Sequence, residues 1–197
     1  MSQAELPPGV QVLERGWLSS NSVLFLGAQS TALVDSGYCA HAEQTLALVA
    51  AALCGRPLDR LVNTHLHSDH CGGNAALQGR WPALQTLIPP GLAQQVAAWD
   101  PVALGYEPSG QRCPRFRYDA PVLPGTEIEL ADRAWQVHAA PGHDPDSVIL
   151  FEPGSRTLIS ADALWENGFG VVFPELDERD AFGEVGATFD LIERLGP

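Results

Sequence analysis

Hydrophobic residues occur in short runs along the N-terminal part of the chain, separated by glycine, proline and polar residues. Runs rich in Val, Leu and Phe are typical of strands, and they occur at Val10–Leu13, Ser22–Leu26 and Thr31–Asp35. Between Ala42 and Leu53 the apolar positions instead recur at helical spacing, which predicts a helix that ends before Gly55. A further strand is expected over residues 58–63.

The rest of the chain continues this mixture of strands and helices. Helices are expected to begin near Gly73, after Pro90 and at Ala181. Strands are expected at Leu84–Ile88, Glu127–Leu130, Trp135–Ala139, Ser147–Phe151 and Thr157–Ser160. In the last helix, Ala181–Leu195, the apolar face is predicted to consist of Phe182, Val185, Phe189 and Ile192. This order suggests two sheet-and-helix units packed together in a single domain, residues 1–197.

One segment between these elements has no clear periodicity. From Asp100 to Gly125, proline and glycine recur, and the segment carries Arg112, Arg115 and Arg117. A long irregular segment in a compact domain is often functional. It is either a lid or substrate-contact segment, or a solvated loop without a ligand role.

Composition and charge restrict the classes of function. The formal net charge is −13, and all eleven basic residues are arginine. A chain without lysine cannot carry the lysine of a phosphate-binding P-loop or of a Schiff-base enzyme. An acidic surface repels a phosphate backbone, so we expect no nucleic acid as a partner.

Sequence features also bear on the cellular compartment. The N-terminus lacks the basic and apolar regions of a secretory signal, and no apolar run approaches the roughly 20 residues that cross a bilayer. The cysteines are scattered without a Cys-x-x-Cys pair, which favours reduced thiols: Cys39, Cys54, Cys71 and Cys113. We therefore expect a cytoplasmic protein that acts on a small molecule and has no membrane partner. The sequence does not define its oligomeric state.

The densest group of chemically active side chains lies in the segment His65-Leu66-His67-Ser68-Asp69-His70. Imidazoles and carboxylates so close together are unfavourable in a hydrophobic core, because each buried polar atom needs a hydrogen-bond partner. His65 and His67, two residues apart, are expected to project from the same side at the end of a strand. Asp69 and His70 can fold back where Gly72 and Gly73 break that strand. The alternative is a chance surface cluster, but these ligand types favour a metal site.

Three further candidates follow predicted strands elsewhere in the chain. His143 lies in the turn Pro141-Gly142-His143-Asp144, Asp162 ends a short apolar strand, and Asp35 follows the third strand. Alone, such a histidine is more often structural, and Asp35 could simply cap a turn. Beside the histidine cluster, we interpret His143 and Asp162 as metal ligands and Asp35 as a residue that orients a ligand.

The ordered motifs Val34-Asp35-Ser36-Gly37, His65-x-His67-x-Asp69-His70, Gly72-Gly73-Asn74, Pro141-Gly142-His143 and Ala161-Asp162 extend over most of the chain. In this order they resemble the metallo-β-lactamase-fold superfamily of metallohydrolases. The resemblance implies an α+β fold, a four-layer αββα sandwich with a metal site at the sheet ends. It implies that His65, His67 and His143 bind one metal ion. On the same pattern Asp69 and His70 bind a second ion, and Asp162 bridges the two.

The resemblance also implies a reaction class. Two divalent metal ions, most simply zinc, with iron or manganese also suited to these ligands, would hold a hydroxide that attacks an ester, thioester or lactone-type bond. Asp69 is the candidate catalytic residue that orients or deprotonates the water. Thioester hydrolases resembling glyoxalase II share this ligand set, although the segment Leu164–Gly170 departs from their sequence after the bridging aspartate.

One element of the family pattern is absent from this sequence. The family has a further histidine after a strand that follows the helix at 181–195, and this chain ends before it. We expect the C-terminal strand and helix of the second half to be missing: either the chain is truncated at its C-terminus, or it has lost one ligand of the second metal ion. Neither remaining histidine, His41 or His138, takes that place.

Two alternatives to the hydrolase therefore stay open. One is a mononuclear iron enzyme resembling persulfide dioxygenases, which would need only His65, His143 and Asp162, a ligand type that suits non-haem iron. The other is an inactive fragment with an incomplete metal site.

Overall fold

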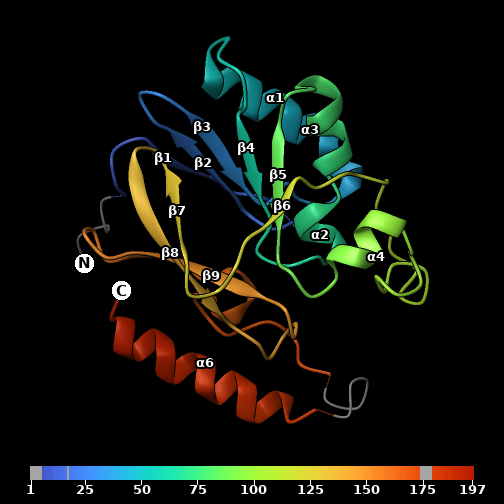
Figure 1. The fold of residues 1–197 in the computed structure, drawn as a ribbon, viewed down its shortest axis with the longest axis vertical. Helices are drawn as coiled ribbons and strands as arrows, with labels where there is room; N and C mark the ends of the chain where they lie inside the picture. Colours follow the sequence, from blue (N-terminus) through green and yellow to red (C-terminus); the bar gives the residue numbers. More distant parts are fainter. Residues whose placement is uncertain (1–5, 17, 174–178) are drawn as a thin grey trace.

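The computed structural model describes residues 6–16, 18–173 and 179–197, and its strands form two sheets that pack face to face (Figure 1). The first sheet contains, in spatial order, β1 (Val10–Leu13), β2 (Ser22–Leu26), β3 (Thr31–Val34), β4 (Arg60–Val62), β5 (Gln85–Ile88) and β6 (Ala120–Pro121). Strands β1 to β3 are antiparallel, and β3 to β6 are parallel. Parallel neighbours need crossover connections, and these hold the helices.

The crossover helices are α1 (Ala42–Leu53), the short α2 (Ser68–Cys71), α3 (Asn74–Arg80) and α4 (Ala93–Ala98). A 3₁₀ turn, η1 (Cys39–His41), precedes α1. The strand β6 lies inside the segment predicted to be irregular. Two residues are too few to give a periodic pattern, so the sequence did not reveal it.

The second sheet is antiparallel, with the order β10 (Thr157–Ile159), β9 (Val148–Glu152), β8 (Arg133–Ala139) and β7 (Glu127–Leu130). A second 3₁₀ turn, η2 (Ala161–Ala163), follows β10, and helix α6 (Ala181–Leu195) lies along the outer face of this sheet (Figure 1). Within the described ranges no helix is long and apolar enough to cross a membrane.

Alternating side chains of the strands divide the apolar residues among three regions of the core, each of which lies between two layers of the fold. Between the sheets, Phe25 packs edge-to-face on Trp135, with ring centroids 5.2 Å apart at 87°. On the other face of the first sheet, Leu33 and Leu61 pack against Val49 of α1 and its neighbours. On the outer face of the second sheet, Ile149 and Ala140 pack against Ile192 of α6. The layers run helix, sheet, sheet, helix, which confirms the predicted αββα sandwich.

The buried face of α6 differs from the prediction. It consists of Ala181, Val185, Thr188 and Ile192, whereas Phe182 is 63% exposed. Val185 fits closely against Gly142, where a Cβ atom would lie 2.5 Å from the valine Cγ2. Gly142 also has φ +136°, a conformation that side chains disfavour. This contact sets the rotation of the helix, so placing Phe182 on the buried face was wrong.

Replacing Phe25 by alanine tests the core between the sheets. The change removes the contact with Trp135 and leaves a cavity, so we expect the free energy of unfolding to fall by about 3–5 kcal/mol. The matched variant Phe182→Ala removes an exposed ring and should cost less than about 0.5 kcal/mol. Chemical denaturation followed by circular dichroism measures both values. Equal losses in the two variants would contradict this placement of Phe25.

Candidate metal centre

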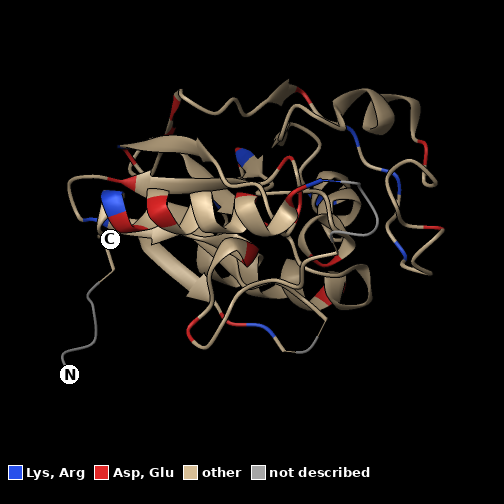
Figure 2. Cartoon of the chain, turned by 90° about the horizontal axis from the view of Figure 1, so that it is seen from below, with Lys and Arg blue, Asp and Glu red and all other residues tan. Residues whose placement is uncertain are grey.

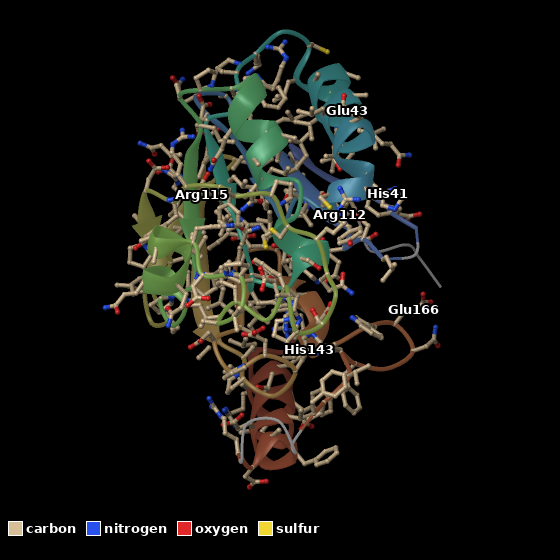
Figure 3. All side chains as sticks on the ribbon, turned by 90° about the vertical axis from the view of Figure 1, so that its right-hand side faces the viewer. His41, Glu43, Arg112, Arg115, His143 and Glu166 are labelled. Atoms are coloured by element: carbon tan, nitrogen blue, oxygen red, sulfur yellow. The ribbon has the colours of Figure 1, made fainter. Side chains whose placement is uncertain are left out.

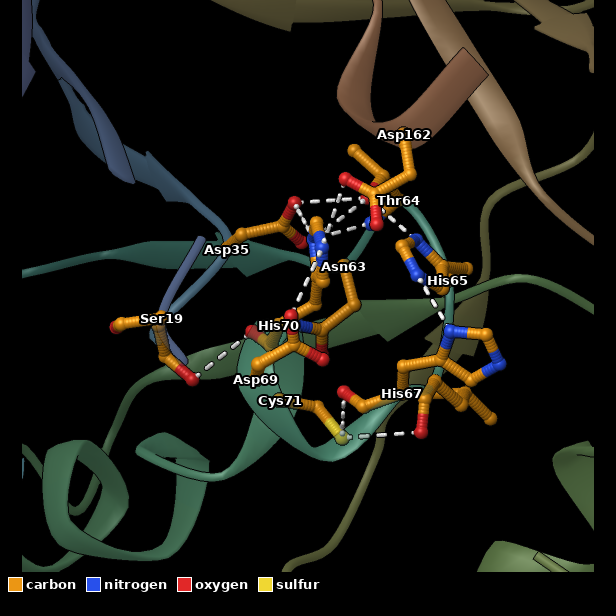
Figure 4. A network of polar contacts seen from close by, with 12 residues as sticks. Ser19, Asp35, Asn63, Thr64, His65, His67, Asp69, His70, Cys71 and Asp162 are labelled. Atoms are coloured by element: carbon orange, nitrogen blue, oxygen red, sulfur yellow. Dashed lines mark hydrogen bonds and ion pairs between the residues drawn. The ribbon is translucent and has the colours of Figure 1, made fainter. Parts of the chain in front are cut away.

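The candidate ligands lie where strands of both sheets end at one edge of the sandwich (Figure 4). Asp35 directly follows β3, and the segment 63–67 follows β4. His143 lies beyond the end of β8, and Asp162 lies in η2 after β10. The two sheets are joined at this edge by a hydrogen bond from the Val148 backbone N–H to the Thr64 carbonyl oxygen, at 2.9 Å. The fold thereby assembles residues that are far apart in the sequence.

Three imidazoles converge on one point. His67 Nδ1 lies 3.1 Å from His65 Nε2 and 2.9 Å from His143 Nε2. His65 is fully buried, and Figure 4 shows one of its ring nitrogens directed at the ring of His67. Imidazole nitrogens that converge at these distances have the arrangement of ligands around a transition metal ion. The group His65, His67 and His143 is the one expected to bind the first ion.

Asp162 lies between His70 and His143. Its Oδ1 is 3.3 Å from His70 Nε2, and its Oδ2 is 3.2 Å from His143 Nε2. The ligand atoms of His65, His70 and Asp162 also lie within 4.8 Å of one another. A carboxylate with one oxygen toward each histidine occupies the place that a bridging ligand needs.

Asp69 is more peripheral than the sequence suggested. Its Oδ2 lies 3.8 Å from His70 Nε2, and its side chain is 36% exposed. Neither of the two compact donor groups found within the described ranges contains it. Its predicted roles, as a ligand and as the residue that handles the water, therefore stay predictions.

Burial and neighbouring charges set the protonation of the histidines. Burial, together with the nearby imidazoles of His70, His67 and His143, holds the pKa of His65 well below its usual 6.5. His65 is thus neutral and keeps a lone pair for a metal. Burial also lowers the pKa of His70, but the carboxylates of Asp35 and Asp162 outweigh it and raise that pKa to about 10.

The charge at Asp162 is stabilised in the same way. Burial favours its neutral form, yet the hydrogen bond with His70 prevails and lowers the pKa of the carboxyl to about 2. His70 is 2% exposed and lies between two carboxylates. Carboxylates that stabilise a proton on a buried imidazole also suit a divalent cation there. The imidazole and carboxylate donor set therefore fits a transition metal.

Asp35 fixes the orientation of His70. Its Oδ2 accepts hydrogen bonds from His70 Nδ1 at 2.8 Å and from the Thr64 hydroxyl at 2.7 Å. Its Oδ1 accepts a bond from the Thr64 backbone N–H at 2.9 Å. With Nδ1 occupied, His70 directs Nε2 toward Asp162. Asp35 adopts φ 57°, a conformation that Asp and Asn tolerate better than most residues.

A buried amide and hydroxyl network, which sequence reasoning missed, supports the same helix. Ser36 donates to Asn74 Oδ1 at 2.7 Å, Asn74 donates to Asn63 Oδ1 at 2.7 Å, and Asn63 donates to the His70 carbonyl oxygen at 3.2 Å. Gly73 packs against this network, where a Cβ atom would lie 2.5 Å from the Ser36 carbonyl oxygen.

The role predicted for Gly72 and Gly73 needs correction. Both residues have helical backbone angles, so they do not act as a sharp break in a strand. Glycine is needed at both positions because α2 and α3 approach η1 and the end of β3 closely. A Cβ atom on Gly72 would lie 2.6 Å from the backbone nitrogen of Cys39.

The loop after η2 contributes contacts that the sequence did not reveal. The Val171 carbonyl oxygen accepts a hydrogen bond from His143 Nδ1 at 2.6 Å, which leaves Nε2 facing Asp162. Trp165 donates its indole N–H to Asp162 Oδ1 at 3.3 Å. Figure 3 shows the loop, which carries Glu166, extending from the region of His143. Gly170 was a sequence signal for this close approach of the loop to His143, because a Cβ atom at position 170 would lie 2.6 Å from His143 Nδ1.

The arginine-bearing segment lies elsewhere. Arginines gather on the loop at the right of Figure 2, between α4 and β6. The Arg117 guanidinium donates to the carbonyl oxygens of Pro82 and Leu84, so it anchors the segment to the fold. Arg112 and Arg115 are exposed.

A cleft of about 800 Å³ opens beside His70, His143 and Asp162 and extends between the edges of the two sheets. Most of the side chains along it are apolar, including Val10, Val12, Val23, Trp135, Leu158 and Ile159. Among the described residues that line it, none is lysine or arginine. The cleft therefore offers an apolar surface next to the candidate ligands.

Comparisons with known proteins agree with this fold. Residues 15–195 match the family described as Metallo-beta-lactamase superfamily. The chain belongs to this family.

Two similar relatives are hydroxyacylglutathione hydrolases. That of Anaeromyxobacter dehalogenans (strain 2CP-C) is 32% identical over 147 residues, which cover 75% of this chain and 47% of the relative. That of Xanthomonas euvesicatoria pv. vesicatoria is 30% identical over 163 residues, which cover 83% and 50%. This chain thus spans about half the length of these curated relatives.

Solved structures show the same fold. A metallo-beta-lactamase family protein from Thermus thermophilus superposes with a TM-score of 0.78 at 21% identity, covering 98% of this chain and 72% of that one. A beta-lactamase domain protein from Burkholderia ambifaria gives a TM-score of 0.76 at 23% identity, covering 98% and 66%.

Substituting Asp35 by asparagine tests its orienting role. Asparagine tolerates the same backbone but loses the negative charge beside His70, so we expect zinc affinity to fall about 10- to 100-fold. Competition with a chromophoric chelator measures this affinity. Asp59→Asn is the matched control, because Asp59 accepts hydrogen bonds from Thr31 at the opposite end of β4. Unchanged affinity in Asp35→Asn would refute the role.

Proposed function

We propose that this chain is a metal-dependent hydrolase that cleaves ester, thioester or lactone-type bonds at a binuclear centre, most simply of zinc. The observation that carries the proposal is the convergence of the His65, His67 and His143 nitrogens, with Asp162 placed between His143 and His70. The names of the similar relatives support a thioester as one such substrate. Free thiols at all four cysteines support a cytoplasmic location.

Each candidate residue would have a separate role in the proposed reaction. His65, His67 and His143 would hold one ion, Asp69 and His70 a second, and Asp162 would contact both. Divalent ions so held supply an acidified water and polarise a carbonyl oxygen. Asp69, the most exposed carboxylate of the group, would orient the attacking water, accept its proton and return that proton to the leaving group. Trp165 and the Val171 carbonyl keep Asp162 and His143 in position.

The cleft indicates which acyl groups fit. Its described lining includes the carboxylates of Asp35, Asp69, Asp162 and Glu166 but no lysine or arginine, so it offers no ammonium or guanidinium group that would bind an anionic acyl group. The indole N–H of Trp135 and the hydroxyl of Ser20 are buried without hydrogen-bond partners among the described residues. Both atoms have almost no exposed surface, so they do not make the cleft more polar. We therefore propose a substrate with an apolar acyl chain.

The iron alternative uses fewer of these residues. A centre of His65, His143 and Asp162 alone would leave His67 and His70 without a ligand role, although His67 Nδ1 lies 2.9 Å from His143 Nε2. The larger donor set therefore favours the hydrolase over the persulfide dioxygenase-like enzyme.

The metal content of the purified chain and of Asp162→Ala tests the proposed centre. We expect about two zinc ions per wild-type chain, and loss of most metal in Asp162→Ala. Ester hydrolysis should fall more than about 100-fold in that variant, because a direct ligand should cost more than a residue that orients one. Asp190→Ala, an exposed carboxylate on α6, is the matched control.

Other metal contents and activities contradict the proposal in distinct ways. About one iron per chain would favour the oxygenase. Little bound metal in the wild type would favour the inactive fragment. Native turnover in Asp162→Ala would refute the two-metal mechanism.

Narrowing the cleft tests the substrate class. In Val23→Phe the larger ring occupies part of the cleft, so we expect the KM for a long-chain acyl ester to rise about 10-fold relative to that for an acetyl ester. Val102→Phe is the control, because Val102 is 58% exposed and outside the cleft lining. Steady-state kinetics on both esters with one preparation separates this effect from general loss of activity. An unchanged ratio would contradict acyl binding in the cleft.

A further inference from the structure

The thiol of Cys71, on the helix that carries His70, lies close to the thiol of Cys113. Cys71 ends α2 and is fully buried, whereas Cys113 lies on the segment between α4 and β6 and is half-buried. Their sulfur atoms are 3.8 Å apart although the two residues are 42 positions apart in the chain. Neither thiol has a role in the proposed hydrolysis.

Packing holds these two thiols together. Leu104, Tyr106 and Phe116 of the segment are buried in one apolar cluster with Leu66 and Cys71. The Tyr106 hydroxyl donates to the Leu66 carbonyl oxygen at 2.9 Å, and its oxygen lies 3.2 Å from Cys71 Sγ. Buried groups on both sides of Cys113 therefore hold this segment against α2.

We propose that Cys71 and Cys113 form a redox-sensitive pair that hydroperoxides convert into a disulfide. Cys113 is the thiol that meets the oxidant, because it is partly exposed and lies between the exposed residues Arg112 and Pro114. Cys71 is buried directly behind it and resolves the oxidised sulfur.

The reaction balances with one peroxide. The Cys113 thiolate attacks a peroxide oxygen, so an S–O bond forms, the O–O bond breaks, and water leaves after protonation. Cys71 sulfur then attacks the sulfenic sulfur, forming the S–S bond and breaking the S–O bond. The released hydroxide takes the Cys71 proton. Two thiols lose two electrons, and hydrogen peroxide is reduced to two waters.

The geometry requires only a small movement. A disulfide has an S–S length of about 2.05 Å, so the sulfur atoms must approach by less than about 2 Å. Helix α2 is held by the network of Ser36, Asn63 and Asn74, so the segment carrying Cys113 is the part that moves. The hydrogen bond with Cys71 lowers the pKa of the Cys113 thiol despite its burial, which favours the reactive thiolate.

Oxidation would join the irregular segment covalently to α2. The bond closes a loop from residue 71 to residue 113, and such a cross-link restricts the unfolded chain. The oxidised protein should therefore unfold at a temperature about 5 °C or more above the reduced protein.

Peroxide treatment of the whole metal-loaded chain tests the proposal. After addition of equimolar hydrogen peroxide, we expect an intact-mass loss of about 2 Da for one disulfide, reversed by dithiothreitol. Peptide mapping without reductant should identify the Cys71–Cys113 bond. Differential scanning calorimetry should show the higher unfolding temperature.

Single-cysteine variants assign each thiol. Cys113→Ser should form no disulfide, and in Cys71→Ala the oxidation should stop at a Cys113 sulfenic acid that dimedone traps. Cys39→Ser and the exposed Cys54→Ser are the controls and should still form the bond. Three results would overturn the proposal: a Cys39–Cys113 bond, Cys113 sulfinic acid beside free Cys71, or an unchanged wild-type mass. None of these results depends on hydrolase activity.

Discussion

The buried carboxylate of Asp35 is the constraint on which the rest of this site depends. A buried charge is costly unless donors or a cation surround it, and Asp35 is 3% exposed. Its oxygens are satisfied by the backbone and hydroxyl of Thr64 and by the His70 imidazole. These bonds join the end of β3 to the loop after β4 and to α2. The arrangement that stabilises Asp35 therefore also directs His70 toward Asp162.

The remaining donors depend on how the two sheets pack. His65 and His67 follow β4 of the first sheet, whereas His143 and Asp162 follow β8 and β10 of the second. The packing of Phe25 on Trp135 and the bond between Val148 and Thr64 fix one sheet relative to the other. A site built across two sheets is positioned by the core behind it, so core packing and site chemistry are linked in this protein.

Helix α2 connects the candidate centre with the irregular segment between α4 and β6. One turn of helix carries Asp69 and His70 on the side of the centre and Cys71 on the side of Tyr106 and Cys113. The position of that segment and the orientation of α2 are therefore coupled through direct contact. Arg117 anchors the same segment to Pro82 and Leu84, whereas the two residues that flank Cys113, Arg112 and Pro114, are exposed.

Periodicity in the sequence predicted most of the strands and helices, although it missed β6 and the short α2. The resemblance of the motifs to the metallo-β-lactamase-fold superfamily implied the αββα class and the candidate ligands. Periodicity and the His65-x-His67-x-Asp69-His70 spacing are local properties, so one chain is enough to read them. Only the tertiary structure decided the contacts of His143 with Val171, of Asp162 with Trp165 and of Cys71 with Cys113, and the outward position of Phe182. Hydrogen bonding and packing depend on distances through space between remote segments, and those distances are set when the layers pack.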